Sequence, residues 1–230
     1  AVMEREKRLR GIIFLGGRFD YTPGDLAMLN VPFVCCSYSN QYGTLRVGEY
    51  SAVSIADEET ARQAVDHLYD HGHRRIAALI CREDDQSISQ LRYQGYRKAL
   101  ESHGIPLDED LVMCTGTFDI RDAYEAVSRR LRQGADFTAL FAIADSMAIG
   151  AMRALRDAGR RVPEDCSVIA IDGLELSAYI EPPLTTLCQP MEEMGRRSAQ
   201  ILLGMLLGHG SHCCEVLPTQ LREGGSVQSI

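Results

Sequence analysis

The segment from Asp145 to Gly173 constrains the fold more than any other stretch of this chain. Its first part has apolar residues at helical spacing that form one stripe: Met147, Ala151, Ala154, Leu155 and Ala158. Such a stripe is typical of a helix that packs on a sheet. We expect Asp145 to be the N-cap of this helix and Gly159 to follow its last residue. A turn and an apolar strand come next, so the segment predicts one helix–strand step that ends in the carboxylate of Asp172.

The same exchange of short apolar runs and helical patterns continues along most of the chain. Strands are predicted at 11–15, 32–36, 53–56, 74–81, 111–114, 138–143 and 167–171. Helices are predicted at 57–71, 87–103, 121–133 and 145–158. After Asp172 the order changes to an extended run at 185–188, a helix at 190–207 and a last extended segment at 215–221. This alternation predicts an α/β fold with parallel sheets that helices cover on both faces.

Composition excludes several other classes of protein. The chain has 230 residues, 45% of them hydrophobic, which is enough for one large domain or two small ones. No apolar run approaches the roughly 18 residues that a membrane-spanning helix needs. The eight cysteines lack the regular spacing of a disulfide framework, which favours a reducing cytoplasm. A net charge of −8 repels phosphate, so we do not expect this chain alone to bind nucleic acid.

Motifs for catalysis or metal binding have little support. The chain has no Gly-x-Ser-x-Gly elbow, no phosphate-binding loop and no His-Glu-x-x-His. Four possible metal ligands do fall within six residues: His209, His212, Cys213 and Cys214. Neighbouring residues would be strained as ligands of one tetrahedral site, so an oxidation-prone surface loop is the simpler interpretation. We therefore predict no metal, no cofactor and no enzyme activity.

Five ordered blocks of residues carry a more specific signal. They are Asp-His-Leu at 66–68 with His-Gly-His-Arg-Arg-Ile-Ala at 71–77, Arg-Tyr-Gln-Gly-Tyr-Arg-Lys-Ala-Leu at 92–100, Gly-Ile-Pro at 104–106, the segment 145–173, and Pro-Pro-Leu-Thr-Thr with Gln-Pro between 182 and 190. In order and spacing, from about Arg10 to Gly224, they resemble the lactose-repressor (LacI/GalR) family of transcription regulators. The resemblance lies in the part of those proteins that binds a small effector rather than DNA.

The resemblance implies two parallel-sheet subdomains flanked by helices, of the type I periplasmic-binding-protein kind. Three crossover strands would join them, and an effector would bind in the cleft between them. The first subdomain would hold residues 1–72 and 190–212, and the second would hold 73–189 and 213–230. The family's helix-turn-helix, its hinge helix and the opening strand-helix-strand have no counterpart before Ala1. We therefore expect the first subdomain to be truncated at its N-terminus and the natural protein to be longer.

Two residues are the main candidates for effector binding. Arg92 falls in the predicted helix after 74–81, and its planar fork of donors suits sugar hydroxyls, a carboxylate or a phosphate. Asp172 ends an apolar strand, where a carboxylate is costly to bury without partners and can accept a ligand's donors. The resemblance implies that both contact effector. The alternatives are a surface arginine on an amphipathic helix, and a turn or N-cap aspartate before a short helix that starts at Leu174.

Four further positions are candidates through the resemblance. Phe118 falls where the family often has an aromatic that stacks on a sugar or base, although phenylalanine is also a common core residue. Glu59 falls where an acid can reach the effector, although Asp57, Glu58 and Glu59 together also suit a helix N-terminus. Ala144 replaces an amide that would hold the ligand, which weakens any transfer of sugar specificity. Gln189 completes the set.

The sequence thus predicts the effector-binding and dimerisation core of a cytoplasmic DNA-binding transcription regulator. Its ligand would be a sugar or sugar derivative, and it would act as a homodimer without contact to a membrane. Operator DNA would be bound through the absent helix-turn-helix. The alternative is a periplasmic sugar-binding protein of a transporter, which would need a secretion signal upstream. A third class, an enzyme, would need a nucleophile, an acid–base pair or a metal in the cleft.

Overall fold

The computed structural model describes residues 9–16, 20–27, 29–46, 48–82 and 86–230. Contacts within the chain divide it into two units. Unit 1 comprises Ala1–Ala56 and Pro190–Pro218, and unit 2 comprises Asp57–Gln189 and Thr219–Ile230. The chain therefore passes between the units at three places, after Ala56, after Gln189 and after Pro218.

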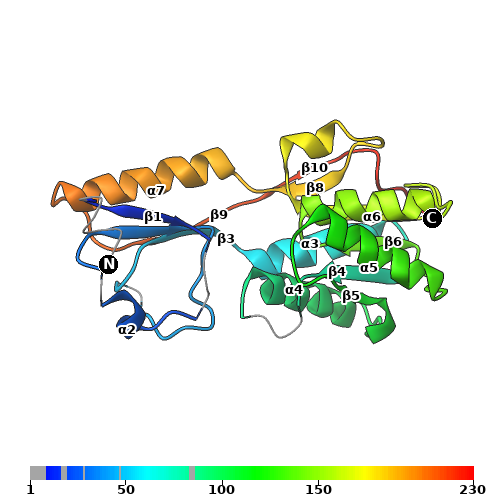
Figure 1. Ribbon diagram of the computed structural model, residues 1–230, viewed down its shortest axis with the longest axis horizontal. Coiled ribbons are helices and arrows are strands. Elements are labelled where there is room, and N and C mark those ends of the chain that lie inside the picture. The colour runs from blue at the N-terminus through cyan, green and yellow to red at the C-terminus, as the bar shows by residue number, and fades with distance from the viewer. Residues whose placement is uncertain (1–8, 17–19, 28, 47, 83–85) are drawn as a thin grey trace. The chain divides into compact units, whose positions relative to one another are not determined.

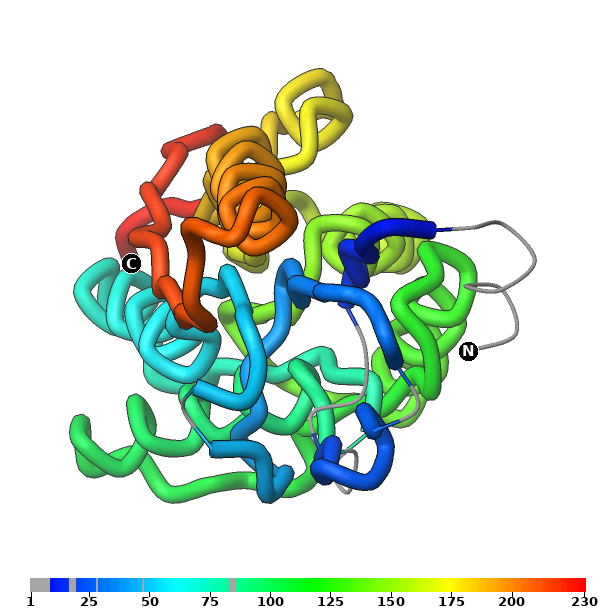
Figure 2. The backbone as a smooth tube through the Cα atoms, turned by 90° about the vertical axis from the view of Figure 1, so that its left-hand side faces the viewer, coloured from blue at the N-terminus to red at the C-terminus, as the bar shows by residue number. Residues whose placement is uncertain are grey.

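Unit 1 is a parallel sheet with a long helix on one face (Figure 1). The strand order is β1-β2-β3-β9, and the strands are β1 (Ile12–Leu15), β2 (Phe33–Cys36), β3 (Ala52–Ile55) and β9 (Cys214–Leu217). Helix α7 (Met191–Leu206), seen end-on in Figure 2, packs on β2, β3 and β1. The short helix α2 (Pro23–Leu26) follows β1 and has a capping box formed by Thr22 and Asp25.

Unit 2 is a six-stranded sheet between two pairs of helices (Figure 1). The order is β10-β8-β7-β6-β4-β5, from β4 (Ile76–Ile80), β5 (Val112–Cys114), β6 (Ala139–Ala142), β7 (Ser167–Asp172), β8 (Thr185–Cys188) and β10 (Gln220–Arg222). The paired helices are α3 (Asp57–Asp70) with α4 (Ile88–Ser102), and α5 (Ile120–Arg132) with α6 (Asp145–Asp157). Two 3-10 turns, Glu109–Leu111 and Glu175–Ala178, complete it. All strand pairs are parallel except β10 with β8, which is antiparallel.

The predicted fold class is confirmed, and most predicted elements occur close to their expected positions. Gly159 comes directly after Ala158, the C-cap of α6, and has a φ of 78°, as a glycine just past a helix C-terminus does. The N-cap prediction is wrong, because Ala144 is the N-cap and Asp145 is the first helical residue. The last extended segment is also two strands rather than one, β9 in the sheet of unit 1 and β10 in the sheet of unit 2.

The two unit boundaries that follow β3 and β9 differ from those expected from the sequence. The expected division placed residues up to Gly72 and up to His212 in the first subdomain. In the structure the first passage between units precedes Asp57, because α3 packs against α4 and contacts β6, β7 and β8 of unit 2. The third passage follows Pro218, because β9 pairs with β3 of unit 1.

The carboxyl ends of β4, β6, β7 and β8 meet at one edge of the unit 2 sheet because these strands are parallel. Ligands of open α/β sheets bind beyond this edge. Ile143, Asp172 and Gln189 lie at these ends. No helix among the described residues is long and apolar enough to cross a membrane.

Candidate functional site

A buried arginine lies at the centre of the candidate site, at the carboxyl edge of the unit 2 sheet. The side chain of Arg92 is only 1% exposed. Its Nε donates to Oδ1 of Asp57 over 2.9 Å, and its Nη1 donates to Oδ1 of Asp172 over 3.2 Å and to the carbonyl of Ile143. Its Nη2 is buried and has no hydrogen-bond partner among the described residues. A buried charged donor without a partner is unfavourable, so this atom is a candidate donor to a small polar molecule.

Close packing of α3 against α4 brings Arg92 to Asp57. Arg92 lies on the buried face of α4, together with Leu91 and Tyr96. Gly95 follows one turn later, and a Cβ there would lie 2.1 Å from the carbonyl oxygen of Glu58 in α3. Only glycine allows the two helix backbones to approach so closely. The Arg92 guanidinium therefore reaches the first residue of the neighbouring helix.

Asp172 has an unusual backbone conformation. Its φ is 139°, which residues other than glycine rarely adopt. The next residue, Gly173, has a φ of 77°, so the chain turns sharply at the end of β7. Strain of this kind tends to collect at ligand sites. The conformation places the carboxylate next to Arg92.

Gln189 holds the carboxylate of Asp172 from the other side. Its Nε2 donates to Oδ1 of Asp172 over 2.7 Å, and its backbone N–H donates to the carbonyl of Asp172 over 3.0 Å. Oδ1 thus accepts hydrogen bonds from both Gln189 and Arg92, while no hydrogen bond from the described residues reaches Oδ2. The site therefore presents one free donor, Nη2 of Arg92, and one free acceptor, Oδ2 of Asp172.

This cluster contains one guanidinium and two carboxylates. Burial raises the pKa of the Asp57 carboxyl, while the charge of Arg92 opposes that rise. Burial alone would lower the pKa of Arg92, but the two carboxylates of Asp57 and Asp172 more than offset this, and the pKa of Arg92 is raised. One guanidinium between two carboxylates stays protonated.

Asp145 supports the loop that follows Asp172. Its buried carboxylate accepts hydrogen bonds from the backbone N–H of Leu174 (2.8 Å), from Oγ of Ser177 (2.7 Å) and from Oγ1 of Thr186 (2.6 Å). Burial raises the pKa of this carboxyl, and the hydrogen bonds oppose the rise. Asp145 therefore acts on the site through the loop rather than as a helix cap.

The structure brings only some of the predicted site residues together. Arg92, Asp172 and Gln189 form one hydrogen-bonded cluster. Ala144 is buried at the N-cap of α6 and brings no polar side chain. Phe118 is 39% exposed in the connection between β5 and α5, and its carbonyl accepts from Oγ of Ser146. Glu59 faces solvent and its carboxylate binds Arg62, which matches the interpretation of this residue as part of a helix N-terminus.

Asp57 is the site residue that sequence reasoning missed. We interpreted it with Glu58 and Glu59 as an acidic first turn of a helix. The overlooked signal is its spacing, because Asp57 lies on the same helical stripe as the buried residues Ala61, Ala64 and Leu68. An acid on an apolar stripe must be paired, and the partner is Arg92.

Metal ligation has no geometric basis in the described part of the chain. No group of three or more His, Cys, Asp or Glu side chains there could hold an ion. In the stretch with four possible ligands, His212 contacts Oγ of Ser51 through Nδ1, and Cys214 begins β9. The polar cluster around Arg92 is instead suited to hydrogen bonding with a small polar molecule.

Comparison with known proteins shows what the chain is similar to. A family model described as a periplasmic binding protein-like domain matches residues 65–227. The chain is 34% identical over 227 residues to the HTH-type transcriptional regulator MalR of Clostridium butyricum, an alignment that covers 98% of this chain and 67% of that protein. The chain spans about two thirds of the length of the curated relatives it matches. These relatives are transcription regulators rather than enzymes.

Two solved structures show the likeness in three dimensions. The complex of the transcriptional regulator CelR with cellobiose has a TM-score of 0.84 and 32% identity, with 98% of this chain and 71% of that chain covered. The lac repressor dimer bound to operator and the anti-inducer ONPF has a TM-score of 0.81 and 27% identity, with 98% of this chain and 76% of that chain covered. Cellobiose is bound in the first structure, and the anti-inducer ONPF is bound in the second.

Proposed function

The chain belongs to the LacI/GalR family of transcription regulators, and on that premise we propose that it is the effector-binding core of such a regulator. One observation carries the location of the effector site. Nη2 of Arg92 is a buried donor without a partner, beside the unused Oδ2 of Asp172. The effector would supply the missing partners of both atoms.

The chemistry of these two atoms favours a ligand rich in hydroxyl groups. A hydroxyl can donate one hydrogen bond and accept others. One hydroxyl of a sugar would donate to Asp172, and a neighbouring hydroxyl would accept from Arg92. Ala144 offers no amide for a further contact, so ligand specificity must depend on other residues. The cellobiose bound to CelR is a ligand of the same class.

The same cluster connects the effector site to the passages between the units. Asp57 is the first residue after the first passage, and Gln189 is the last residue before the second. Both hydrogen-bond to Arg92 or Asp172. Effector bound there would alter the contacts of both passages and shift the population among arrangements of the two units. Such a shift would then change the affinity for DNA, and the DNA would change the affinity for effector by the same factor.

Operator DNA and a second copy of the chain are the proposed partners. The curated relatives are HTH-type regulators, and the lac repressor structure is a dimer on its operator. This chain would bind DNA through a helix-turn-helix outside the residues described here, in the cytoplasm. A candidate self-association surface lies in unit 2, where Leu176 is 56% exposed and Tyr179 is 78% exposed. Large exposed apolar side chains that lie close together mark interaction surfaces.

Titration calorimetry with a panel of neutral sugars, beginning with cellobiose and maltose, tests the proposed effector site. The variants are Arg92→Met and Asp172→Asn, with Arg153→Gln as the control because Arg153 is exposed and paired with Asp157. We expect at least a tenfold loss of affinity in both site variants and none in the control. Equal affinity of all variants for a bound sugar would refute the site. Binding of operator DNA by the full-length protein tests the regulator assignment separately from the alternative of a transporter's binding protein.

A further inference from the structure

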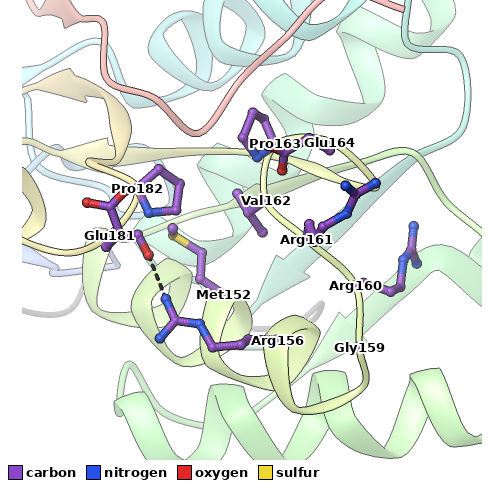
Figure 3. Close-up of a pocket in the computed structure, with 10 residues that line it drawn as sticks. All are labelled: Met152, Arg156, Gly159, Arg160, Arg161, Val162, Pro163, Glu164, Glu181 and Pro182. Atoms are coloured by element: carbon purple, nitrogen blue, oxygen red, sulfur yellow. Dashed lines mark hydrogen bonds between the residues drawn. The ribbon is translucent and has the colours of Figure 1, made fainter.

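A separate cavity lies in unit 2, at the end of the six-stranded sheet opposite to Asp172. Helix α6 starts beyond the carboxyl end of β6 and leads back to the amino end of β7, so its last turn lies far along the strands from Asp172. The cavity at this end has a volume of about 490 Å³. It is lined by the end of α6, the connection from α6 to β7, and the turn before β8 (Figure 3).

Two arginines that line this cavity have no acidic partner among the described residues. Nη2 of Arg156 donates to the carbonyl of Glu181 over 2.7 Å. Nη2 of Arg160 donates to the carbonyls of Phe137 and Asp165, and its guanidinium lies 4.8 Å from the centre of the Phe137 ring. These contacts fix both guanidinium groups without neutralising them. Nε and Nη1 of each remain free to donate.

Neighbouring arginines differ in this respect. Arg161 also lines the cavity, but its Nε and Nη2 both donate to the carboxylate of Asp165. Arg153, one turn before Arg156 on α6, is paired with Asp157 and does not line the cavity. The positive charge that is available to a ligand therefore comes from Arg156 and Arg160.

The acids at the rim do not occupy these donors. Glu164 and Glu181 line the cavity, and both are exposed to solvent. Figure 3 shows the backbone oxygen of Glu181 facing Arg156 while its carboxylate points away. Among the described side chains, neither acid forms an ion pair with Arg156 or Arg160.

Backbone N–H groups cap three carbonyls near the end of helix α6. The backbone N–H groups of Ala158, Gly159 and Arg160 donate to the carbonyls of Ala154, Arg156 and Leu155 respectively. This is the arrangement that satisfies free carbonyls at a helix C-terminus.

We propose that this cavity binds a small molecule through an oxyanion group, either a carboxylate or a phosphate. Guanidinium forks match the geometry of both groups, and a donor already held by protein carbonyls loses little freedom on binding. The apolar part of the ligand would contact Met152, Val162 and Pro182, which line the same cavity. This site is distinct from the proposed effector site, since none of its residues belongs to the cluster around Arg92.

Calorimetry with two simple anions tests the proposal. The full chain is titrated at low ionic strength with inorganic phosphate and, separately, with citrate, so that the two kinds of oxyanion are distinguished. We expect saturable binding of at least one anion, weakened about tenfold by Arg156→Gln, the effect of one charge-assisted hydrogen bond. Arg153→Gln is the matched control, because it removes the same charge from the same helix outside the cavity.

Each outcome decides the proposal. A loss confined to Arg156→Gln, with binding unchanged in Arg153→Gln, supports it. Equal losses in Arg156→Gln and Arg153→Gln would show general surface charge and overturn it. Absence of saturable binding of both anions to the unaltered chain would overturn it as well.

Discussion

The guanidinium of Arg92 in α4 donates through Nε to the carboxylate of Asp57, the first residue of α3, over 2.9 Å. Both side chains are almost fully buried. The pair joins two helices of unit 2 at the point where the chain enters that unit. It also orients the guanidinium so that Nη1 meets Asp172 and Nη2 is left free. The same contact thus serves both the stability of the fold and the geometry of the proposed site.

Removal of the acid from this pair should be strongly destabilising. Asp57→Ala leaves a buried guanidinium with one carboxylate fewer, and we expect the free energy of unfolding to fall by about 3–5 kcal/mol. The adjacent variant Glu58→Ala removes only a partly exposed bond to Lys98, and we expect it to cost about 1 kcal/mol or less. Urea unfolding of both variants measures the difference. Similar small losses would show that the Arg92–Asp57 pair is unimportant for the fold.

Two glycine substitutions should have opposite signs. Gly95→Ala places a Cβ 2.1 Å from the carbonyl of Glu58, so α3 and α4 must separate and the free energy of unfolding should fall by roughly 1–3 kcal/mol. Gly195 lies in α7, and no atom lies within 4 Å of the Cβ that Gly195→Ala would add. The higher helix propensity of alanine should therefore raise the free energy of unfolding by roughly 0.5–1 kcal/mol. Thermal unfolding compares them. A stabilised Gly95→Ala variant would contradict the close helix contact.

Stability should depend on the protonation of His73. Burial lowers the pKa of His73 below its ordinary value of 6.5, while a hydrogen bond to the carbonyl of Gln228 opposes this. The unfolded chain therefore takes up this proton at a higher pH than the folded chain. The contribution of neutral His73 is complete well above pH 6.5 and is lost as the pH falls through that value toward the lower folded pKa.

Unfolding measured from pH 7.5 down to about pH 5 tests this contribution. His73→Gln should lose less stability over that range than the unaltered chain, because the titrating group is gone. The control is His209→Gln, since His209 is exposed. Parallel profiles for all three proteins would show that His73 contributes nothing.

The proposed dimer surface predicts that a charged substitution there will shift the protein from dimer to monomer. Tyr179→Asp places a charge on a side chain that is 78% exposed in the single chain, so folding should be unaffected while self-association weakens. Sedimentation at several concentrations of the full-length protein measures the monomer fraction. A dimer that persists unchanged in this variant would place the interface elsewhere.

How far the sequence predicted the structure depended on whether a pattern was local. The stripe of α6, the glycine after its end and the apolar strand β7 are local patterns, and each appears in the structure. The missed division between β9 and β10 is not local. A single extended pattern cannot show that Leu217 pairs with a strand of one unit while Gln220 pairs with a strand of the other.

The candidate site shows the same limit. A family pattern predicts Arg92 and Asp172 as site residues. Local patterns place Asp57 at a helix N-terminus instead, because its partner lies 35 residues further along the chain. A local pattern also predicts Asp145 as a helix cap, because an acid before an apolar helix usually is one. Its real partners, Ser177 and Thr186, come together only when β8 packs beside β7. Sequence patterns do not show which distant residue pairs with a buried acid.

The crystal structure of the chain with a bound neutral sugar tests the central claim most directly. The account predicts a ligand oxygen within about 3 Å of Nη2 of Arg92 and a ligand hydroxyl donating to Oδ2 of Asp172. The pairs Arg92–Asp57 and Gln189–Asp172 should persist in that complex. A sugar bound elsewhere, with Nη2 of Arg92 still buried and without a partner, would contradict the assignment.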